Sequence, residues 1–182
     1  MAETIATYEA RVSGLWNTRH TISSPEGQLG VMVVARNGRG TITSGNYTPV
    51  KGEVLRFRRD PGLLRSQFSL WTEGREWLGS SLRSNFLRRE IALATGNKPY
   101  RLVPTAAFGR GWRMFAPKSG EMARIEPLTL RRTTKIDVFR RVDFELLLFA
   151  YFLGSQVYPE SFWPSRDLLA EQESSIPTPS KA

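Results

Sequence analysis

The sequence predicts a mainly β protein in which one domain wraps around a single apolar helix. Turn signals recur about every ten residues from Gln28 onward, the spacing expected for a sandwich or a barrel. The segments between these turns alternate apolar and polar residues, as half-buried strands do. One block near the C-terminal end, residues 144–153, is apolar at almost every position. A helix that is apolar on every face must be buried, and we predict that the strands surround it.

Residues 1–27 carry the weakest signal, because Ser13-Gly14 and Ser23-Ser24-Pro25 interrupt any long element. We predict a partly ordered lead-in that adds an edge strand or a short helix. The only histidine of the chain, His20, lies in this segment among polar residues, without an evident catalytic partner.

The first clear element is a hairpin. Leu29–Ala35 and Gly40–Ser44 flank Asn37-Gly38, a dipeptide that favours a two-residue turn. The sequence 46–48, Asn-Tyr-Thr, matches the glycosylation sequon and is interpreted as an ordinary turn. Further strands are predicted at 53–59, 67–71, 76–82, 87–95, 100–103, around Trp112 and Met114, at 122–126 and at 133–139.

The apolar block is predicted to be a central helix over 143–153. Asp143 is the expected N-cap, Glu145 lies in the first turn where a negative charge suits the helix dipole, and Gly154 is the expected C-cap. At 1.5 Å per residue the helix is about 15 Å long, half of a bilayer core of ~30 Å. We therefore expect a buried core helix and no transmembrane span.

Composition favours an anionic partner. The 182 residues carry a formal net charge of +9, which suits an anionic membrane surface, a phosphoinositide, nucleic acid or an acidic protein. The alternative is that the basic residues only keep the strand faces solvated. The absence of cysteine excludes disulfides, thiolate metal sites and lipidation on cysteine. Without a signal peptide, the expected location is cytoplasmic, with a peripheral position at a membrane as an option.

Catalytic motifs are absent from the sequence. There is no Gly-x-Ser-x-Gly elbow and no phosphate-binding Gly-x-x-x-x-Gly-Lys loop, so we predict no catalytic residue, no cofactor and no metal site. The enzymatic alternative is a pair of carboxylates that face each other in a barrel mouth.

Basic side chains form the candidate ligand-binding set, because guanidinium groups bind phosphate oxygens through two parallel hydrogen bonds. Nucleic acid is the less favoured ligand: Phe57, Trp112, Phe115 and Phe139 alternate with basic residues, but interior aromatics and exterior arginines produce the same pattern. The candidate residues are Arg56, Arg58, Arg59, Arg88, Arg89, Arg131, Arg132, Lys135, Arg140 and Arg141.

Over residues 28–158 the order of elements resembles the tubby-like superfamily, which comprises the tubby C-terminal domain, the phospholipid scramblases and the LURP-one-related proteins. The resemblance is carried by the segments 99–102 (Pro-Tyr-Arg-Leu), 112–115 (Trp-Arg-Met-Phe), 120–125 (Gly-Glu-Met-Ala-Arg-Ile) and 136–138 (Ile-Asp-Val), which lead into the apolar helix. It implies a closed barrel of about twelve antiparallel strands threaded by that helix. Residues 159–182 are then a C-terminal cover and a disordered polar tail.

The functions within this superfamily differ. Tubby proteins bind phosphoinositides through basic side chains, whereas scramblases carry palmitoylated cysteines and an acidic calcium-binding segment before the helix. This chain has no cysteine and is basic before the helix, and it resembles the LURP-one-like branch most. We therefore expect a non-enzymatic barrel module that binds anionic lipid headgroups or another phosphate-bearing partner through a basic outer face.

Overall fold

The fold is described from a computed structural model of the chain. It describes residues 3–14, 18–60, 67–82, 90–96, 98–105, 111–128 and 132–157. The predicted C-terminal cover and polar tail over 159–182 lie outside these residues.

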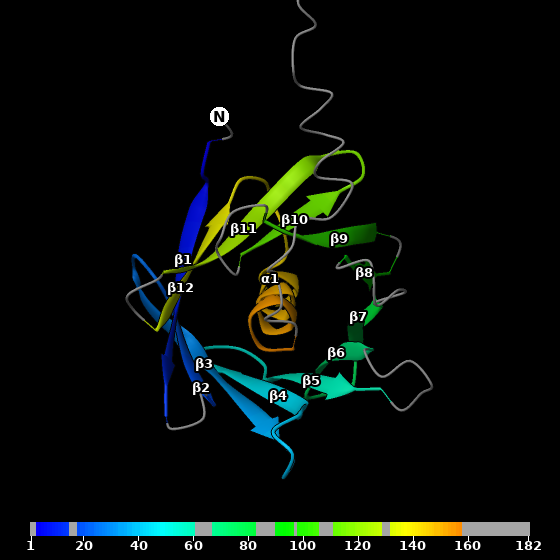
Figure 1. Cartoon of the computed structure of the whole chain (residues 1–182). Coiled ribbons are helices and arrows are strands. Elements are labelled where there is room, and N and C mark those ends of the chain that lie inside the picture. The colour runs from blue at the N-terminus through cyan, green and yellow to red at the C-terminus, as the bar shows by residue number, and fades with distance from the viewer. Residues whose placement is uncertain are drawn as a thin grey trace, which may run out of the picture.

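Twelve antiparallel strands of the described residues form a closed barrel, as predicted. Consecutive strands pair with each other, and β1 pairs with β12. Figure 1 shows helix α1 at the centre of this ring of strands. The helix, α1 (Phe144–Phe152), continues into a π-helical turn over Leu153–Val157. The strands are β1 (Ala6–Ser13), β2 (Arg19–Ser24), β3 (Gly27–Arg36), β4 (Ile42–Pro49), β5 (Leu55–Arg59), β6 (Phe68–Thr72), β7 (Trp77–Leu82), β8 (Ile91–Thr95), β9 (Lys98–Pro104), β10 (Trp112–Ala116), β11 (Gly120–Leu128) and β12 (Thr133–Val138).

The barrel begins upstream of the boundary predicted at residue 28. Strands β1 and β2 lie within the lead-in, and β1 closes the barrel by pairing with both β2 and β12. Their sequence signal is weak because turn-forming residues, Ser13-Gly14 and Ser23-Ser24-Pro25, lie at or directly after the end of each strand. The fully buried positions are also mixed in type, since Ala10 and His20 accompany Ile22.

The connection between β3 and β4 is longer than the predicted two-residue turn. Residues 37–41 form it, and the Asn37 Oδ1 atom accepts hydrogen bonds from the backbone N–H groups of Arg39 and Thr41, at 3.0 and 2.9 Å. Gly40 takes the left-handed conformation, with φ of 76°. The amide side chain of Asn37 therefore organises a wider loop. The sequon 46–48 lies within β4 and is not a turn.

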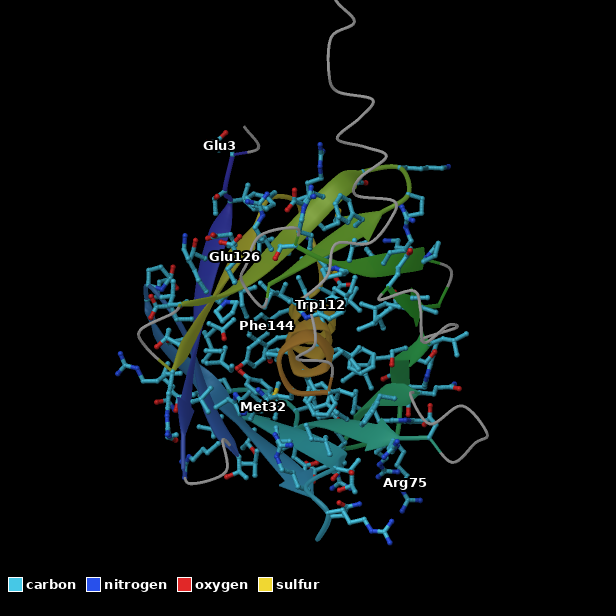
Figure 2. All side chains as sticks on the ribbon, in the orientation of Figure 1. Glu3, Met32, Arg75, Trp112, Glu126 and Phe144 are labelled. Carbon is cyan, nitrogen blue, oxygen red and sulfur yellow. The ribbon has the colours of Figure 1, made fainter. Side chains whose placement is uncertain are left out.

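The core consists of the helix and the strand residues that face it. Every residue of α1 from Leu146 onward is buried, so all faces of this part of the helix contact the barrel wall. Phe152 stacks on Phe57 of β5 with ring centroids 4.9 Å apart, and meets Phe68 of β6 edge-on at 5.5 Å. Figure 2 shows Met32 and Trp112 inside the barrel and Arg75 at its periphery. Aromatic packing of this kind adds to the stabilisation from burial alone.

Both ends of the helix differ from their predicted caps. Asp143 stands at the N-cap position, but its side chain makes no capping hydrogen bond. Gly154 does not end the helix, because the backbone continues through it into the π-helical turn. A Cβ atom at Gly154 would lie 2.7 Å from Cδ1 of Trp112. Glycine is therefore required there by the close approach of the Trp112 ring.

No helix in the described part of the chain is long and apolar enough to cross a membrane.

The contact between Gly154 and Trp112 gives a stability test. Gly154→Ala should lower the free energy of unfolding by about 1–3 kcal/mol, because the buried indole has little freedom to move away from a new methyl group. The change should appear in urea denaturation, although alanine is the better helix former. As a control, Gly38→Ala should have little effect, since nothing lies within 4 Å of a Cβ atom at that position. Equal effects of the two substitutions would contradict this account of Gly154.

Candidate functional site

The antiparallel topology gives the barrel two distinct rims. Odd-numbered strands begin, and even-numbered strands end, at the rim where α1 starts; the other strand ends surround the C-terminal end of the helix. Two contacts mark the second rim: Gly154 lies beside Trp112, the first residue of β10, and Tyr151 bonds to His20 near the start of β2. Each rim therefore carries a different set of connections.

Arginines concentrate at the rim that surrounds the C-terminal end of α1. Eight of the described arginines lie within two residues of this end of a strand or in the connection there. One of them, Arg113 in β10, pairs with Glu121, and we call the other seven the arginine rim. They occupy one continuous arc of six neighbouring strands, from β12 through β1, β2, β3 and β4 to β5. Five of them are exposed, and Arg36 and Arg59 are half-buried. The arginine rim consists of Arg11, Arg19, Arg36, Arg39, Arg58, Arg59 and Arg132.

Backbone carbonyl groups hold two of these guanidinium groups in place. Arg36 donates to the Gly40 carbonyl at 3.0 Å, and Arg132 donates to the Gly14 carbonyl at 3.4 Å. A neutral carbonyl orients the guanidinium without neutralising its charge. Both groups therefore keep their positive charge at this rim.

Few acidic residues offset this charge. Asp60, Glu90 and Glu126 are the acidic residues of the described chain that lie equally close to this rim. Asp60 accepts a hydrogen bond from Ser69, Glu90 pairs with Arg101 at 3.2 Å, and Glu126 lies 4.0 Å from Arg124. The rim is therefore strongly basic.

The structure brings only part of the predicted basic set together. Arg58, Arg59 and Arg132 belong to the arginine rim. Arg58 and Arg59 lie in β5, at one end of its arc, and Arg132 precedes β12, at the other end. Arg88, Arg89 and Arg131 lie outside the described residues.

The other predicted residues lie elsewhere. Arg56 pairs with Glu73 at 3.3 Å, toward the opposite rim. Lys135 lies two residues from the start of β12, but its charge is neutralised by Asp137 at 2.9 Å. Arg140 and Arg141 are exposed in the connection from β12 to α1, at the rim where the helix starts. These four residues do not join the arginine rim.

Four arginines of the rim were not predicted: Arg11, Arg19, Arg36 and Arg39. Arg11 and Arg19 lie beside the connection from β1 to β2, and Arg36 and Arg39 lie at the connection from β3 to β4. These are the first and third connections along the chain. In an up-and-down barrel, alternate turns share a rim, so grouping charges by alternate turns would have found them.

An ion-pair cluster covers part of the outer wall over β10 and β11. Glu121 accepts hydrogen bonds from Arg113 and from Arg124, each at 2.9 Å. Burial raises the pKa of Glu121, but the hydrogen bonds and charges of the two arginines outweigh burial, so the pKa is lowered overall. Glu121 is therefore ionised at neutral pH and neutralises charge on this wall.

The aromatic residues considered for stacking on nucleic acid bases are engaged within the fold. Phe57 and Trp112 are buried inside the barrel. Arg113 lies over the ring of Phe115 at 4.7 Å, and Arg124 lies over the ring of Phe139 at 5.5 Å. These cation–π contacts cover one face of each outer ring.

His20 differs from its predicted surroundings. It is fully buried in β2, and its Nδ1 atom lies 2.7 Å from the Tyr151 hydroxyl on α1. Burial raises the pKa of Tyr151, and hydrogen bonds with Ser155 and Thr134 offset part of that shift. The pair joins the helix to the wall through a polar contact within the core. Within the described residues, no three acidic or histidine side chains are grouped closely enough to hold a metal ion.

Glu121 gives a test with a defined pH dependence. Glu121→Gln should lower the free energy of unfolding at pH 7 by about 1.5–3 kcal/mol, because two charge-assisted hydrogen bonds are weakened. The lowered pKa means that the stabilisation is present above the ordinary value of about 4.3 and is lost as the pH falls through the folded-state pKa. The difference in unfolding free energy between the unaltered protein and Glu121→Gln, measured by urea denaturation, should therefore be smaller in the acid range than at pH 7.

The control is Glu126→Gln, which removes the exposed carboxylate 4.0 Å from Arg124. It should change stability by less than about 0.5 kcal/mol. A deficit for Glu121→Gln that stays constant into the acid range would contradict the role of its charge.

Comparisons with known proteins support the fold alone. No protein-family model matches the chain, and no curated protein matches it in sequence. A solved X-ray structure of a protein from Arabidopsis thaliana is similar, with a TM-score of 0.57 and 11% sequence identity. The match covers 86% of this chain and 94% of the plant protein. At that identity, the similarity shows that the two chains share the barrel architecture.

Proposed function

We propose that this chain is a non-enzymatic binding module whose arginine rim contacts anionic lipid headgroups or another phosphate-bearing partner. One observation carries the proposal: the arginines form a continuous arc at one end of the barrel, where few acidic residues oppose them. The opposite rim has fewer of the described arginines: Arg75, Arg140 and Arg141 are exposed there, and Arg56 pairs with Glu73.

The chemistry of guanidinium favours phosphate. Its planar fork donates two parallel hydrogen bonds to a pair of phosphate oxygens, and it keeps its charge at any physiological pH. Each basic residue close to an anionic membrane contributes roughly 1 kcal/mol of attraction, which salt screens. Five exposed arginines in the described part of the rim are therefore enough for reversible peripheral binding.

Kinship with the tubby-like superfamily is part of the proposal, with the LURP-one-related proteins as the nearest branch. The closed barrel, its central apolar helix and the structural similarity to the Arabidopsis thaliana protein support it. The suggested contact surface is the end of the barrel, where the strand connections meet, and not the flat outer face of its strands. A cytoplasmic protein that visits the membrane surface fits this arrangement.

The test compares two doubly substituted proteins with the same net charge. Arg39→Ala with Arg58→Ala removes two exposed charges from the arginine rim; Arg140→Ala with Arg141→Ala removes two from the opposite rim. Cosedimentation with phosphoinositide-containing vesicles should show roughly 30-fold weaker binding for the first variant, about 2 kcal/mol, and little change for the second. Binding of the unaltered protein should weaken as salt increases.

Two results would refute the proposal. One is an equal loss for both variants, which would mean that only net charge matters. The other is no vesicle binding at low salt, where attraction between exposed charges is least screened. Binding of a single-stranded oligonucleotide, measured in parallel, distinguishes a nucleic-acid ligand from a lipid ligand.

A further inference from the structure

The opposite rim, where α1 begins, opens into a cavity of about 820 Å³. The start of the helix and the adjacent ends of strands β1 to β8 line it. This volume lies within the range of about 300–1,000 Å³ that is usual for small-molecule sites. The cavity lies at the end of the barrel away from the arginine rim.

The cavity wall is largely apolar. Tyr8, Leu55, Leu70, Phe144 and Leu146 contribute to it, and Figure 2 shows Phe144, the first residue of α1, inside the barrel. Ile5, also on the wall, is 60% exposed at the entrance. A ligand with an apolar body would bury surface against these side chains, which favours binding.

The charges around the cavity have the opposite sign to the rest of the protein. Four carboxylates line it, Glu26, Glu53, Asp143 and Glu145, against the single charge of Lys51 among the described lining residues. The whole chain carries +9. Glu53 also accepts a hydrogen bond from the Gly74 backbone at 2.7 Å. Since the described acidic residues are not grouped closely enough for a metal ion, the excess charge suits a larger organic cation.

A buried hydroxyl on the cavity wall has no partner. Tyr47 of β4 is only 2% exposed, and its hydroxyl forms no hydrogen bond with the described residues. Its ring lies over Gly30 of β3, where a Cβ atom would be 2.6 Å from the hydroxyl oxygen. A buried polar group without a partner costs free energy, and a ligand that bonds to it recovers that cost.

The protonation of this hydroxyl is set by its surroundings. Burial, with a further contribution from the negative charge of Glu145, raises the pKa of Tyr47 to about 12. Tyr47 is therefore neutral at physiological pH, and its oxygen can accept a hydrogen bond from an ammonium N–H. The carboxylate of Glu145 is close enough to influence it.

We propose that this cavity binds an organic amine, with the apolar body against Phe144, Leu55 and Leu70 and the ammonium group between Tyr47 and Glu145. An anion of the same shape is disfavoured by the carboxylates. A neutral analogue gains only the apolar contact. The aromatic faces of Tyr47 and Phe144 add attraction for a cation. The carboxylates at residues 143 and 145 outweigh the partial positive charge of roughly half a unit at the helix N-terminus.

The experiment uses three probes with the same eight-carbon chain: octylammonium, octan-1-ol and octanoate. Isothermal titration calorimetry on the full chain at pH 7 and low salt should give affinities in that order, with octylammonium at least about tenfold tighter than octanoate. Equal affinities for the three probes, or no octylammonium binding at millimolar concentration, would overturn the proposal.

Two substitutions locate the ammonium group. Glu145→Gln should weaken octylammonium binding about tenfold and leave octan-1-ol binding unchanged, because one charge-assisted contact is lost. The control Glu9→Gln removes an exposed carboxylate from β1, outside the cavity lining, and should have no such effect. An equal loss in both variants would also overturn the proposal.

Tyr47→Phe adds a second readout. It should weaken octylammonium binding about three- to tenfold while the melting temperature of the free protein stays equal or rises, since a hydroxyl without a partner is removed. Tyr100→Phe, at a buried tyrosine of β9 that is not on the cavity wall, is the matched control. Unchanged octylammonium binding by Tyr47→Phe would refute the role of the hydroxyl.

Discussion

The burial of one apolar helix is the constraint on which the rest of this structure depends. From Leu146 onward α1 has no face that can meet water, so the sheet must surround it completely. An open sheet would leave part of the helix exposed and would also leave two unpaired edges; closure through β1 and β12 removes both costs. Gly45 lets strand β4 approach the ring of Phe152 on the helix, and Gly154 lets the end of the helix approach the ring of Trp112 on the wall. The helix and barrel therefore stabilise each other.

Closure also determines where function can reside. The lumen is filled along most of its length by α1 and the rings that pack on it, which leaves the two ends of the barrel and the outer wall. On the wall, charges are largely paired, as around Glu121. At the ends the two signs separate: one end carries an arc of arginines, and the other a cavity with an excess of carboxylates. If a flat anionic surface contacts the arginine rim, the cavity faces the solvent, so the two proposed activities do not compete for space.

Much of the fold could be predicted because its strong signals are local. Alternation in β5 and the apolar run of α1 identify elements regardless of their partners. Strands β1 and β2 were not identified as two strands because turn residues interrupt their segment and because the burial of His20 depends on Tyr151, more than a hundred residues later. Of the candidate site, Arg58, Arg59 and Arg132 were predicted, but the neighbours that complete the arc depend on which turns share a rim. Tyr47 gave no signal, since an orphan hydroxyl exists only in three dimensions.

Pairing of β1 with β12 also has a consequence for how the chain folds. Thr7 bonds to Asp137, 130 residues away, and the helix that fills the lumen follows β12. The barrel therefore cannot close, and its core cannot fill, before β12 and α1 have been synthesised. Because the β1–β12 pairing spans most of the chain while the other eleven pairings join consecutive strands, closure carries the largest loop-closure cost. Until closure, early strands expose unpaired edges and apolar faces. A ribosome-bound chain that lacks α1 would have strands with nothing to enclose, and chaperone assistance at this stage would be of most benefit.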